Sequence, residues 1–229
     1  MKLEVKVLFP PNKEIAELMI INCAAGMKST RTQEPAHALN VNYYVCSRSS
    51  FKACEQCGEK KDCAKRMILQ AKEEKHWGVF EHFFATVSVS GISRVLTHQL
   101  VRHRLASYLQ QSSRHVKPIG GILPQCIWDL ENTNKELYLE VIDNISESNV
   151  LYDKLIHVGI PKEDARFIMH EGSQTHIMIT MNARQWLHFF YMRLSEHAQW
   201  EIKEVAQKIL DEFMKLSPII FEGAGELEV

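Results

Sequence analysis

Stretches of alternating apolar and polar residues, separated by long helical patterns, constrain the fold of this chain most strongly. Residues 2–8 and 83–90 alternate as half-buried strands do, and the apolar run over 176–182 is typical of a buried strand. No regular alternation of strand and helix connects these segments, which argues against a doubly wound parallel sheet. The pattern therefore predicts an α+β fold in which helices predominate.

Apolar residues at helical spacing predict the helices around these strands. Asp62 and Ser93 are expected to cap helices, and Gly91 to end the second strand. The acidic tail 222–229 is expected to fray. No repeat or linker divides the chain, so we expect one domain over residues 1–229. The expected helices cover 15–23, 62–76, 93–104, 134–157 (one helix, or two broken near 146–149), a short segment after Pro161, 183–194 and 196–216.

Composition argues against several classes of function. The formal net charge is −1, so no overall charge attracts the chain to nucleic acid or to an anionic membrane. No apolar run is long enough to span a bilayer and the first residues lack a signal-peptide pattern, so a cytoplasmic protein is expected. Within this neutral background, basic residues gather between Arg102 and His115. Such a local cluster indicates a bounded anionic ligand rather than a polyanion.

Six cysteines occur in a chain without a secretion signal, which favours thiols or a metal site over disulfides. The four between Cys46 and Cys63 are close enough in sequence to hold zinc, but they include only one Cys-x-x-Cys pair where a zinc ribbon has two. We therefore favour free or buried thiols and expect no metal, with structural zinc as the alternative. The cysteines are Cys23, Cys46, Cys54, Cys57, Cys63 and Cys126.

The segment from Arg102 to Arg114 contains the residues with the clearest chemistry. Guanidinium groups present fixed forks of donors that match phosphate oxygens, and hydroxyls or backbone amides complete such a site. Arg102 and Arg104, two positions apart at a helix end, point in different directions, so each can serve a different phosphate. The alternative is a solvated, charged helix end, because surface arginines are common.

In order, this segment reads Arg-His-Arg-x-x-Ser-x-x-x-x-Ser-x-Arg. It resembles the signature of the flavin-dependent thymidylate synthases. Residues 76–82 resemble the family's His-x-x-x-Phe-Glu-His segment, and two later blocks, 181–184 and 193–201, resemble others of the family. The matched part covers residues 62–204. The resemblance implies a twisted antiparallel sheet flanked by helices, of the thymidylate synthase-complementing type.

The resemblance also implies which residues bind two nucleotides. His76 would lie near the flavin ring, where folate and nicotinamide stack, and it would act in catalysis together with Arg193. The Arg193 cation would favour loss of the uracil N3 proton and make C5 a better nucleophile. The residues implied to contact FAD are Gly78, Arg102, His103, Arg104, Gln110, Asn182, Ala183, Arg184 and His188. Those implied to contact dUMP are Gln99, Arg102, Gln110, Gln111, Ser112, Ser113, Arg114, Arg166 and Arg193.

Departures from the family pattern and structural alternatives both bear on these roles. Gln110 stands where the family usually has Glu, and a neutral amide can form hydrogen bonds but cannot take up a proton. Trp77 and Gly78 replace polar residues, which bears on the rim of the flavin pocket and on folate access. The alternatives are packed histidines at His76 and His188, an exposed helix residue at Gln99, and ion pairs of Arg166 and Arg193 with Glu163 or Glu196.

The implied reaction is the reductive methylation of dUMP to dTMP. Methylenetetrahydrofolate supplies the carbon, NADPH reduces bound FAD, and the reduced flavin supplies a hydride. No Rossmann glycine fingerprint is present, which agrees with flavin binding through arginines and with NADPH as a transient reductant. The resemblance implies a homotetramer with active sites shared between subunits. Two alternatives remain: an RNA-binding module that uses the basic cluster 102–117, and a zinc-stabilised relative without catalysis.

Overall fold

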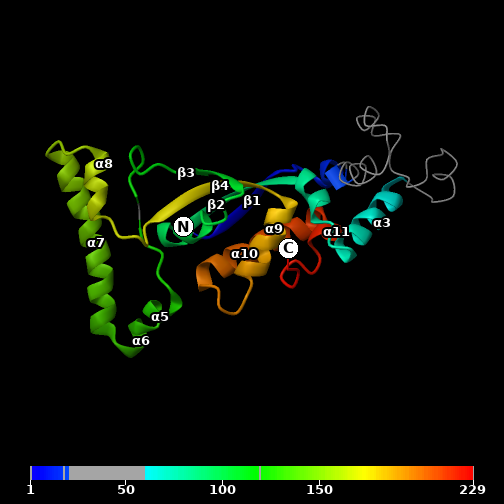
Figure 1. Ribbon diagram of the computed structural model, residues 1–229. Coiled ribbons are helices and arrows are strands. Elements are labelled where there is room, and N and C mark those ends of the chain that lie inside the picture. Colours follow the sequence, from blue (N-terminus) through cyan, green and yellow to red (C-terminus); the bar gives the residue numbers. More distant parts are fainter. Residues whose placement is uncertain (1, 18, 21–59, 119, 229) are drawn as a thin grey trace.

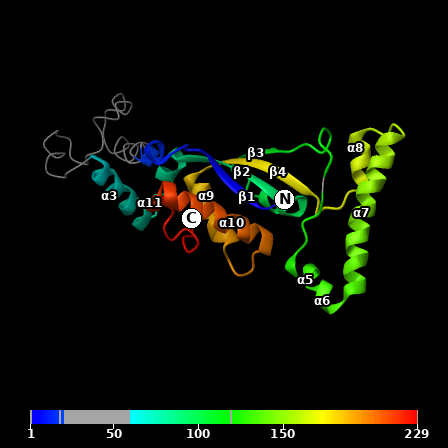
Figure 2. The same ribbon diagram turned by 180° about the vertical axis from the view of Figure 1, so that it is seen from behind.

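A four-stranded antiparallel sheet in the order β1-β2-β4-β3 lies at the centre of the molecule. The computed structural model describes residues 2–17, 19–20, 60–118 and 120–228. This arrangement of helices around an antiparallel sheet confirms the predicted α+β class. The strands are β1 (Glu4–Phe9), β2 (Phe84–Ser93), β3 (Ala106–Gln110) and β4 (Gln174–Asn182). One side of the sheet is covered by α9 (Ala183–Arg193), α10 (Trp200–Leu216) and α11 (Pro218–Phe221) (Figure 1, Figure 2).

Alternating side chains of the two central strands form the core against these helices. In β2, Ala85, Val87 and Val89 are fully buried, and Ile177 and Ile179 of β4 are buried with them. Each large apolar side chain removed from water contributes about 1.5–3 kcal/mol, and a slip of one residue would expose them all, so this face fixes the register. Four rings complete the core, with centroids of contacting pairs 4.7–6.1 Å apart: Trp186, Phe190, Phe213 and Phe221.

A β-bulge interrupts the pairing of β2 at Gly91. The register with β4 shifts between Ser90 and Ile92, and Gly91 has a φ of +71°. A Cβ atom at this position would lie 2.6 Å from the carbonyl oxygen of Lys2, so only glycine fits there. The prediction that Gly91 ends the strand is therefore wrong, because β2 continues through the bulge to Ser93.

Ser93 begins the helix that precedes the motif, as predicted. Its Oγ accepts a hydrogen bond of 3.0 Å from an amide in the first turn of α4 (Arg94–Leu100). The buried carboxylate of Glu201, in the first turn of α10, accepts a hydrogen bond from the Ser93 amide at 2.7 Å and another from its hydroxyl. These bonds fix the start of α4 against α10, and thereby the position from which the motif begins.

The motif itself forms a turn followed by an edge strand, and this differs from the prediction. The amides of Arg102 and His103 donate hydrogen bonds to carbonyl oxygens three residues earlier, at 3.3 and 3.1 Å. These bonds form a tighter, 3-10-type turn that ends the helix. The predicted helix end near Arg104 is therefore wrong, because α4 stops at Leu100. After this turn, Ala106–Gln110 form β3, which pairs with β4 and was not predicted from the sequence.

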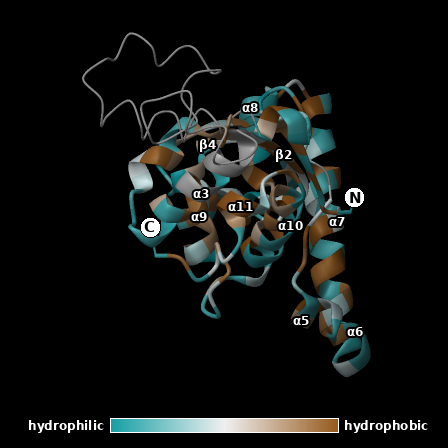
Figure 3. Ribbon diagram, turned by 90° about the vertical axis from the view of Figure 1, so that its right-hand side faces the viewer, coloured by the Kyte–Doolittle hydropathy of each residue, from teal (hydrophilic) through white to brown (hydrophobic). Residues whose placement is uncertain are grey.

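α7 (Lys135–His157) forms an arm that extends away from the sheet (Figure 1). Its 23 residues span about 35 Å at 1.5 Å per residue. It is one unbroken helix, which confirms the first of the two predictions for residues 134–157, one helix rather than two. Figure 3 shows apolar stretches along α7, where Val150 and Leu151 are 51% and 47% exposed. The arm also includes α5 (Gln125–Trp128), α6 (Leu130–Thr133), α8 (Lys162–Ala165) and the 3-10 helix η3 (Arg166–Ile168).

The opposite end of the sheet carries α3 (Lys60–Glu73) and the 3-10 helix η2 (Trp77–His82) (Figure 1). Asp62 lies inside α3, so the prediction that it caps this helix is wrong. The C-terminal tail also differs from its prediction. Ala224 is 1% exposed, and Nζ of Lys72 donates a hydrogen bond of 2.9 Å to the backbone carbonyl of Glu222. The described part of the tail packs against the body and is not frayed.

Some predictions fall on residues outside those that the structure describes. The helix predicted over 15–23 is observed at 13–17 and 19–20, and the rest lies outside. In the described ranges, no group of three His, Cys, Asp or Glu side chains is arranged to hold a metal ion. None of the helices described there is long and apolar enough to cross a membrane. Cys126 is a free, exposed thiol, whereas Cys23, Cys46, Cys54, Cys57 and the side chain of Cys63 lie outside the described residues.

Candidate active site

His103, the middle residue of the motif's Arg-His-Arg, lies beside Arg193 from the C-terminal end of α9. Nε of Arg193 donates a hydrogen bond of 3.0 Å to Nε2 of His103, which is 6% exposed. The ring packs edge-on against Phe189 and His188, with centroids 5.1 and 6.1 Å away. The Tyr108 hydroxyl in β3 donates a hydrogen bond of 2.8 Å to the backbone carbonyl of His103. We call His103, Tyr108, His188, Phe189 and Arg193 the buried cluster.

Burial shifts the pKa values of three groups in this cluster. Burial, followed by the charges of Arg193 and His188, lowers the pKa of His103 from 6.5 to about 4. The ring is therefore neutral near pH 7, with its proton on Nδ1, so that Nε2 accepts the bond from Arg193. Burial raises the pKa of Tyr108 to about 12 against the opposing charge of Arg193, so its hydroxyl remains a donor. Burial also lowers the pKa of Arg193, which Tyr108 partly offsets, but a guanidinium stays charged.

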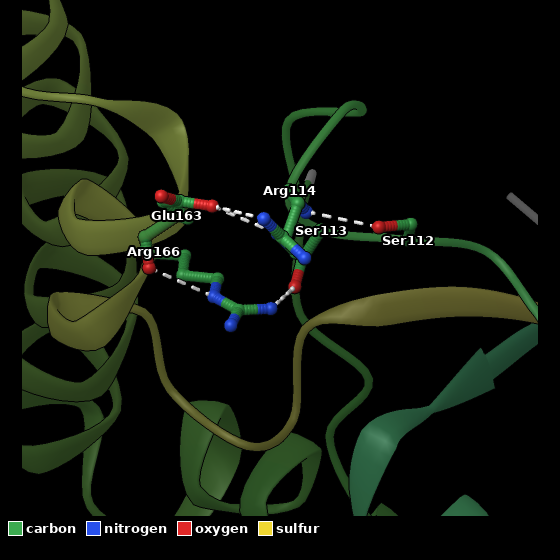
Figure 4. Close-up of polar contacts among 5 residues, drawn as sticks. All are labelled: Ser112, Ser113, Arg114, Glu163 and Arg166. Carbon is green, nitrogen blue, oxygen red and sulfur yellow. Dashed lines mark hydrogen bonds and ion pairs between the residues drawn. The ribbon is translucent and has the colours of Figure 1, made fainter.

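The other end of the motif is bound to α8 by an exposed ion pair and to η3 by a partly buried hydrogen bond (Figure 4). Nε and Nη2 of Arg114 both approach one carboxylate oxygen of Glu163, at 2.8 and 2.6 Å. Nη1 of Arg166 donates to Oγ of Ser113 at 2.9 Å, and its Nε donates to the backbone carbonyl of Glu163 at 2.9 Å. The Arg114 amide lies 3.3 Å from Oγ of Ser112. We call these five residues the arginine clip.

A cleft of about 310 Å³ opens beside the arginine clip. Ser113 and Arg166 line it, and α4 contributes Arg94 and His98, which are four positions apart and so share a helix face. His170 also lines the cleft, and burial lowers the pKa of its imidazole. Two guanidinium groups beside a hydroxyl form a surface suited to an anion. The remaining lining residues are Pro118, Phe167, Met169 and Glu171.

Gln110, the residue that departs from the family's usual Glu, lies between α4 and β4. Its Nε2 donates to Oγ1 of Thr97 at 3.2 Å and to Oγ1 of Thr175 at 3.3 Å. The Thr97 hydroxyl donates its own proton to the carbonyl of Arg94 at 2.8 Å, so it offers a lone pair toward Gln110. An amide donor therefore suits this position better than a carboxylate, which would lack a proton to donate.

The start of α9 holds three of the residues implied to contact FAD. The Asn182 side chain caps the helix by accepting a bond of 2.9 Å from a first-turn amide, and Ala183 is fully buried. Arg184 forms an ion pair with Glu81 of η2 at 2.7 Å, with both side chains 46% exposed. This pair ties η2 to α9, and its exposure leaves both groups accessible to a ligand.

η2 carries the remaining residues on the flavin side. Nε2 of His76 lies 2.8 Å from a carboxylate oxygen of Glu74, and the two side chains are 51% and 41% exposed. Gly78 is exposed, and a Cβ there would meet nothing within 4 Å. Trp77 is 9% exposed and its ring lies 5.7 Å from that of Phe80. Trp77 is thus a core residue, and its departure from the family pattern concerns packing rather than a pocket rim.

Arg102 and Arg104 lie on the exposed turn between α4 and β3. Neither forms an ion pair with any residue that the structure describes. Gln99 is partly buried on α4, and Gln111 is exposed just beyond β3. The two arginines are therefore available to a charged ligand. Gln99 precedes this turn on α4, and Gln111 follows β3.

Within one chain most of the predicted site residues form three separate groups: the buried cluster, the arginine clip, and the start of α9 with η2. Arg102 and Arg104 on the exposed turn, and the three glutamines, lie outside these groups. Arg184 and Arg193 are nine positions apart on α9, which separates them by about 13 Å along the helix. His188 belongs to the buried cluster and not to the group around Arg184. The ion pairs of Arg166 and Arg193 with Glu163 or Glu196, which were the structural alternative to their functional roles, are not formed among the described residues, where Glu163 pairs with Arg114 instead.

Four residues near these groups were not predicted from the sequence: Arg94, His98, Glu163 as the partner of Arg114, and His170. The four-residue spacing of Arg94 and His98 on a helix already predicted after Ser93 would have identified the first two. Glu163 is 49 positions from Arg114, and nothing in the local sequence indicates that they pair.

A comparison with protein families identifies the group to which this chain is related. Residues 29–219, which include the whole motif and all three groups, match the family described as thymidylate synthase complementing protein. The chain belongs to this family. The match confirms the resemblance that the Arg-His-Arg motif indicated.

Individual relatives are similar to part of the chain. The flavin-dependent thymidylate synthase of Sulfurisphaera tokodaii is 44% identical over 151 residues, which is 66% of this chain and 58% of that protein. That of Geobacter sulfurreducens is 41% identical over 152 residues, 66% of this chain and 65% of that protein. That of Pyrococcus horikoshii is 47% identical over 157 residues, 63% of this chain and 62% of that protein. The chain matches less than two thirds of each relative's length, and none of these comparisons supports the RNA-binding alternative.

Proposed function

We propose that this chain is a flavin-dependent thymidylate synthase that converts dUMP to dTMP by reductive methylation. One observation carries the proposal. Ser113 of the motif meets Arg166, 53 positions away, beside a cleft that Arg94 also lines. These residues come from three segments and converge where a phosphate would bind. The relatives' name, flavin-dependent thymidylate synthase, supports the same function.

The arginine clip and its cleft would hold the phosphate of dUMP. Arg114 and Arg166 would donate paired hydrogen bonds to phosphate oxygens, with Ser112, Ser113 and the side-chain amide of Gln111 as further donors. Gln110 is held between two threonine hydroxyls through its Nε2, which leaves its carbonyl oxygen to accept from a ligand. Gln99 would contact the same nucleotide from α4.

The residues around the exposed turn fit FAD. Arg102 and Arg104 are two exposed cations without an ion-pair partner in the described part of the chain, which suits a diphosphate. When bound, FAD reduced by NADPH supplies the hydride that completes the methyl group. Little of His103 is exposed, so we assign it to positioning Arg193. The further residues proposed to line the flavin are Gly78, Gln110, Asn182, Ala183, Arg184 and His188, with His76 near the ring.

Arg193 is the proposed catalytic cation. His103 holds its Nε, and the terminal guanidinium nitrogens have no hydrogen-bond partner among the described residues. Those nitrogens would bind the uracil ring, favour loss of the N3 proton and stabilise the negative charge that makes C5 nucleophilic toward the methylene carbon of the folate. The neutral state of His103 keeps this cation oriented without adding a second charge.

We also propose the finer properties that the resemblance implies: a twisted sheet of the thymidylate synthase-complementing type, a cytoplasmic location, and a homotetramer with shared active sites. The separation of the three groups supports a shared site. Arg184 and Arg193 lie about 13 Å apart along one rigid helix, so they cannot both contact the same small group. A second copy would bring together residues that one chain keeps apart.

The proposal is tested on the purified protein. We expect the visible spectrum of oxidised flavin, bleaching by NADPH that is faster with dUMP, and dTMP formation that requires dUMP and methylenetetrahydrofolate. Arg104→Ala should reduce flavin content, whereas Lys154→Ala, which removes an exposed cation of α7, should not. Protein that forms no dTMP after addition of FAD would overturn the proposal. Tight, salt-sensitive RNA binding or stoichiometric zinc in colourless protein would instead support the two alternatives.

A further inference from the structure

The carboxylate of Glu163 occupies the donors that the proposed substrate needs. Both Nε and Nη2 of Arg114 are directed at one Glu163 oxygen, at 2.8 and 2.6 Å (Figure 4). Arg166 does not bond to the Glu163 side chain. It donates instead to the Glu163 backbone carbonyl and to the Ser113 hydroxyl. A change to the Glu163 side chain therefore alters the charge facing Arg114 and leaves the contacts of Arg166 intact.

We propose that Glu163 sets the affinity of this chain for a nucleoside monophosphate by competing with the ligand's phosphate for Arg114. The inference rests on the proposed function of the arginine clip and names a residue that tunes it. A carboxylate and a phosphate both accept the forked hydrogen bonds of a guanidinium, so one Arg114 cannot serve both fully. Glu163 thus acts as a competing anion built into α8.

The solvent exposure of the Arg114–Glu163 ion pair limits how strongly Glu163 can change the affinity for dUMP. The Arg114 and Glu163 side chains are 58% and 47% exposed, and ion pairs in such positions are weak and screened by salt. The pair is therefore easily exchanged, and its loss should change ligand affinity by about fivefold at most. In addition, the negative charge of Glu163 repels a dianionic phosphate but has little effect on an uncharged nucleoside.

Titration calorimetry of dUMP into the purified full-length chain at low ionic strength tests the inference. Glu163→Gln should lower the Kd for dUMP by about three- to fivefold, and the gain should disappear near 1 M salt. Glu163→Ala should act in the same direction. Asp164→Asn is the matched control: it makes the same charge change one position away, on an exposed residue with no described side-chain partner, and should leave the Kd nearly unchanged.

A double-mutant cycle isolates the contact. Arg114→Ala should weaken dUMP binding, and adding Glu163→Gln to it should have no further effect, because the competition needs Arg114. If Glu163→Gln leaves the Kd unchanged or raises it, or if Asp164→Asn gives the same gain, this inference is wrong while the proposed function stands. If the original chain binds no dUMP, both are wrong. If it binds dUMP equally well without Arg114, this inference and the assignment of Arg114 to the phosphate are wrong. Unfolding midpoints of every variant show whether each one is folded.

Discussion

The buried cluster and the arginine clip each orient an arginine of the proposed site, but in opposite surroundings. Arg193 bonds to a neutral imidazole that is 6% exposed, and loss of Arg193 would leave this buried ring nitrogen without its partner. Arg114 bonds to a carboxylate in an ion pair that is about half exposed on both sides, where water can replace either partner. The first arginine is fixed in place, whereas the second can change partners.

This difference matches two requirements of the proposed chemistry. A cation that stabilises charge developing on a base works best when its orientation is set before the reaction. A cation that captures a phosphate from solution must release its resting partner, which is only possible if that contact is weak. The four predictions below test this contrast in order of decreasing expected effect, and loss of the fixed Arg193 cation is expected to have the largest.

Arg193→Ala should have the largest effect. Loss of a preorganised cation facing developing negative charge should reduce the rate of dTMP formation by about 100-fold or more. Flavin content, measured from the visible spectrum, should remain the same because Arg193 is not proposed to hold the cofactor. Glu196→Ala, three residues away on an exposed position, serves as the control and should turn over normally. Normal turnover by Arg193→Ala would end its assignment as the catalytic cation.

His103 should make the stability of the protein depend on pH. Its pKa is about 4 in the folded state against 6.5 ordinarily, so as pH falls the unfolded chain takes up this proton first. The stabilisation is complete above about pH 6.5 and is lost as pH falls toward 4, with a loss of about 2 kcal/mol between pH 7 and pH 5. Urea unfolding at both pH values measures it. His103→Gln keeps an acceptor that does not titrate, and an equally large loss in that variant would rule out His103 as the source.

Arg166→Ala should weaken dUMP binding by about tenfold or more, because a charge-assisted hydrogen bond contributes about 1.5–3 kcal/mol. Lys162→Ala removes the same charge from the same segment and should change the Kd by less than about threefold, since an exposed lysine contributes little. Titration calorimetry gives both values. If Arg166→Ala and Lys162→Ala weaken dUMP binding equally, Arg166 contributes only its positive charge and no specific hydrogen bond to the phosphate.

Tyr108→Phe should have the smallest effect. The half-buried hydroxyl donates to the carbonyl of His103, and one such neutral hydrogen bond contributes about 1 kcal/mol. The free energy of unfolding should fall by about that amount, while dUMP affinity stays unchanged. A large loss of dUMP affinity would show that the buried cluster and the arginine clip are coupled and not independent.

The elements predicted correctly share one property: a buried face that repeats with a regular period. β2 and α9 each present such a face, so alternation or helical spacing identified them, and β4 was identified by its apolar run. β3 was missed because it is an edge strand with Ser107 and Leu109 exposed, and its pairing with β4 joins residues far apart in sequence. Gly91 was misread because its role depends on the backbone of Lys2, a contact that no local pattern reveals.

In the candidate site, too, features with a local sequence pattern could be predicted and contacts between distant residues could not. The residues of the motif could be identified from their spacing and from the family resemblance. Their partners could not, because Arg114 and Glu163 are 49 positions apart and His103 and Arg193 are 90 positions apart. Chemistry that depends on residue type is thus readable from the sequence, whereas the surroundings that fix or release each arginine require the fold.

A crystal structure of the protein with FAD and dUMP tests most directly whether the motif binds nucleotide phosphates. We expect the dUMP phosphate at Ser113 and Arg166, with Arg114 turned from Glu163 toward it and the FAD diphosphate at Arg102 and Arg104. If both nucleotides bind elsewhere, and Ser113 and these four arginine side chains are directed into solvent, this expectation is contradicted.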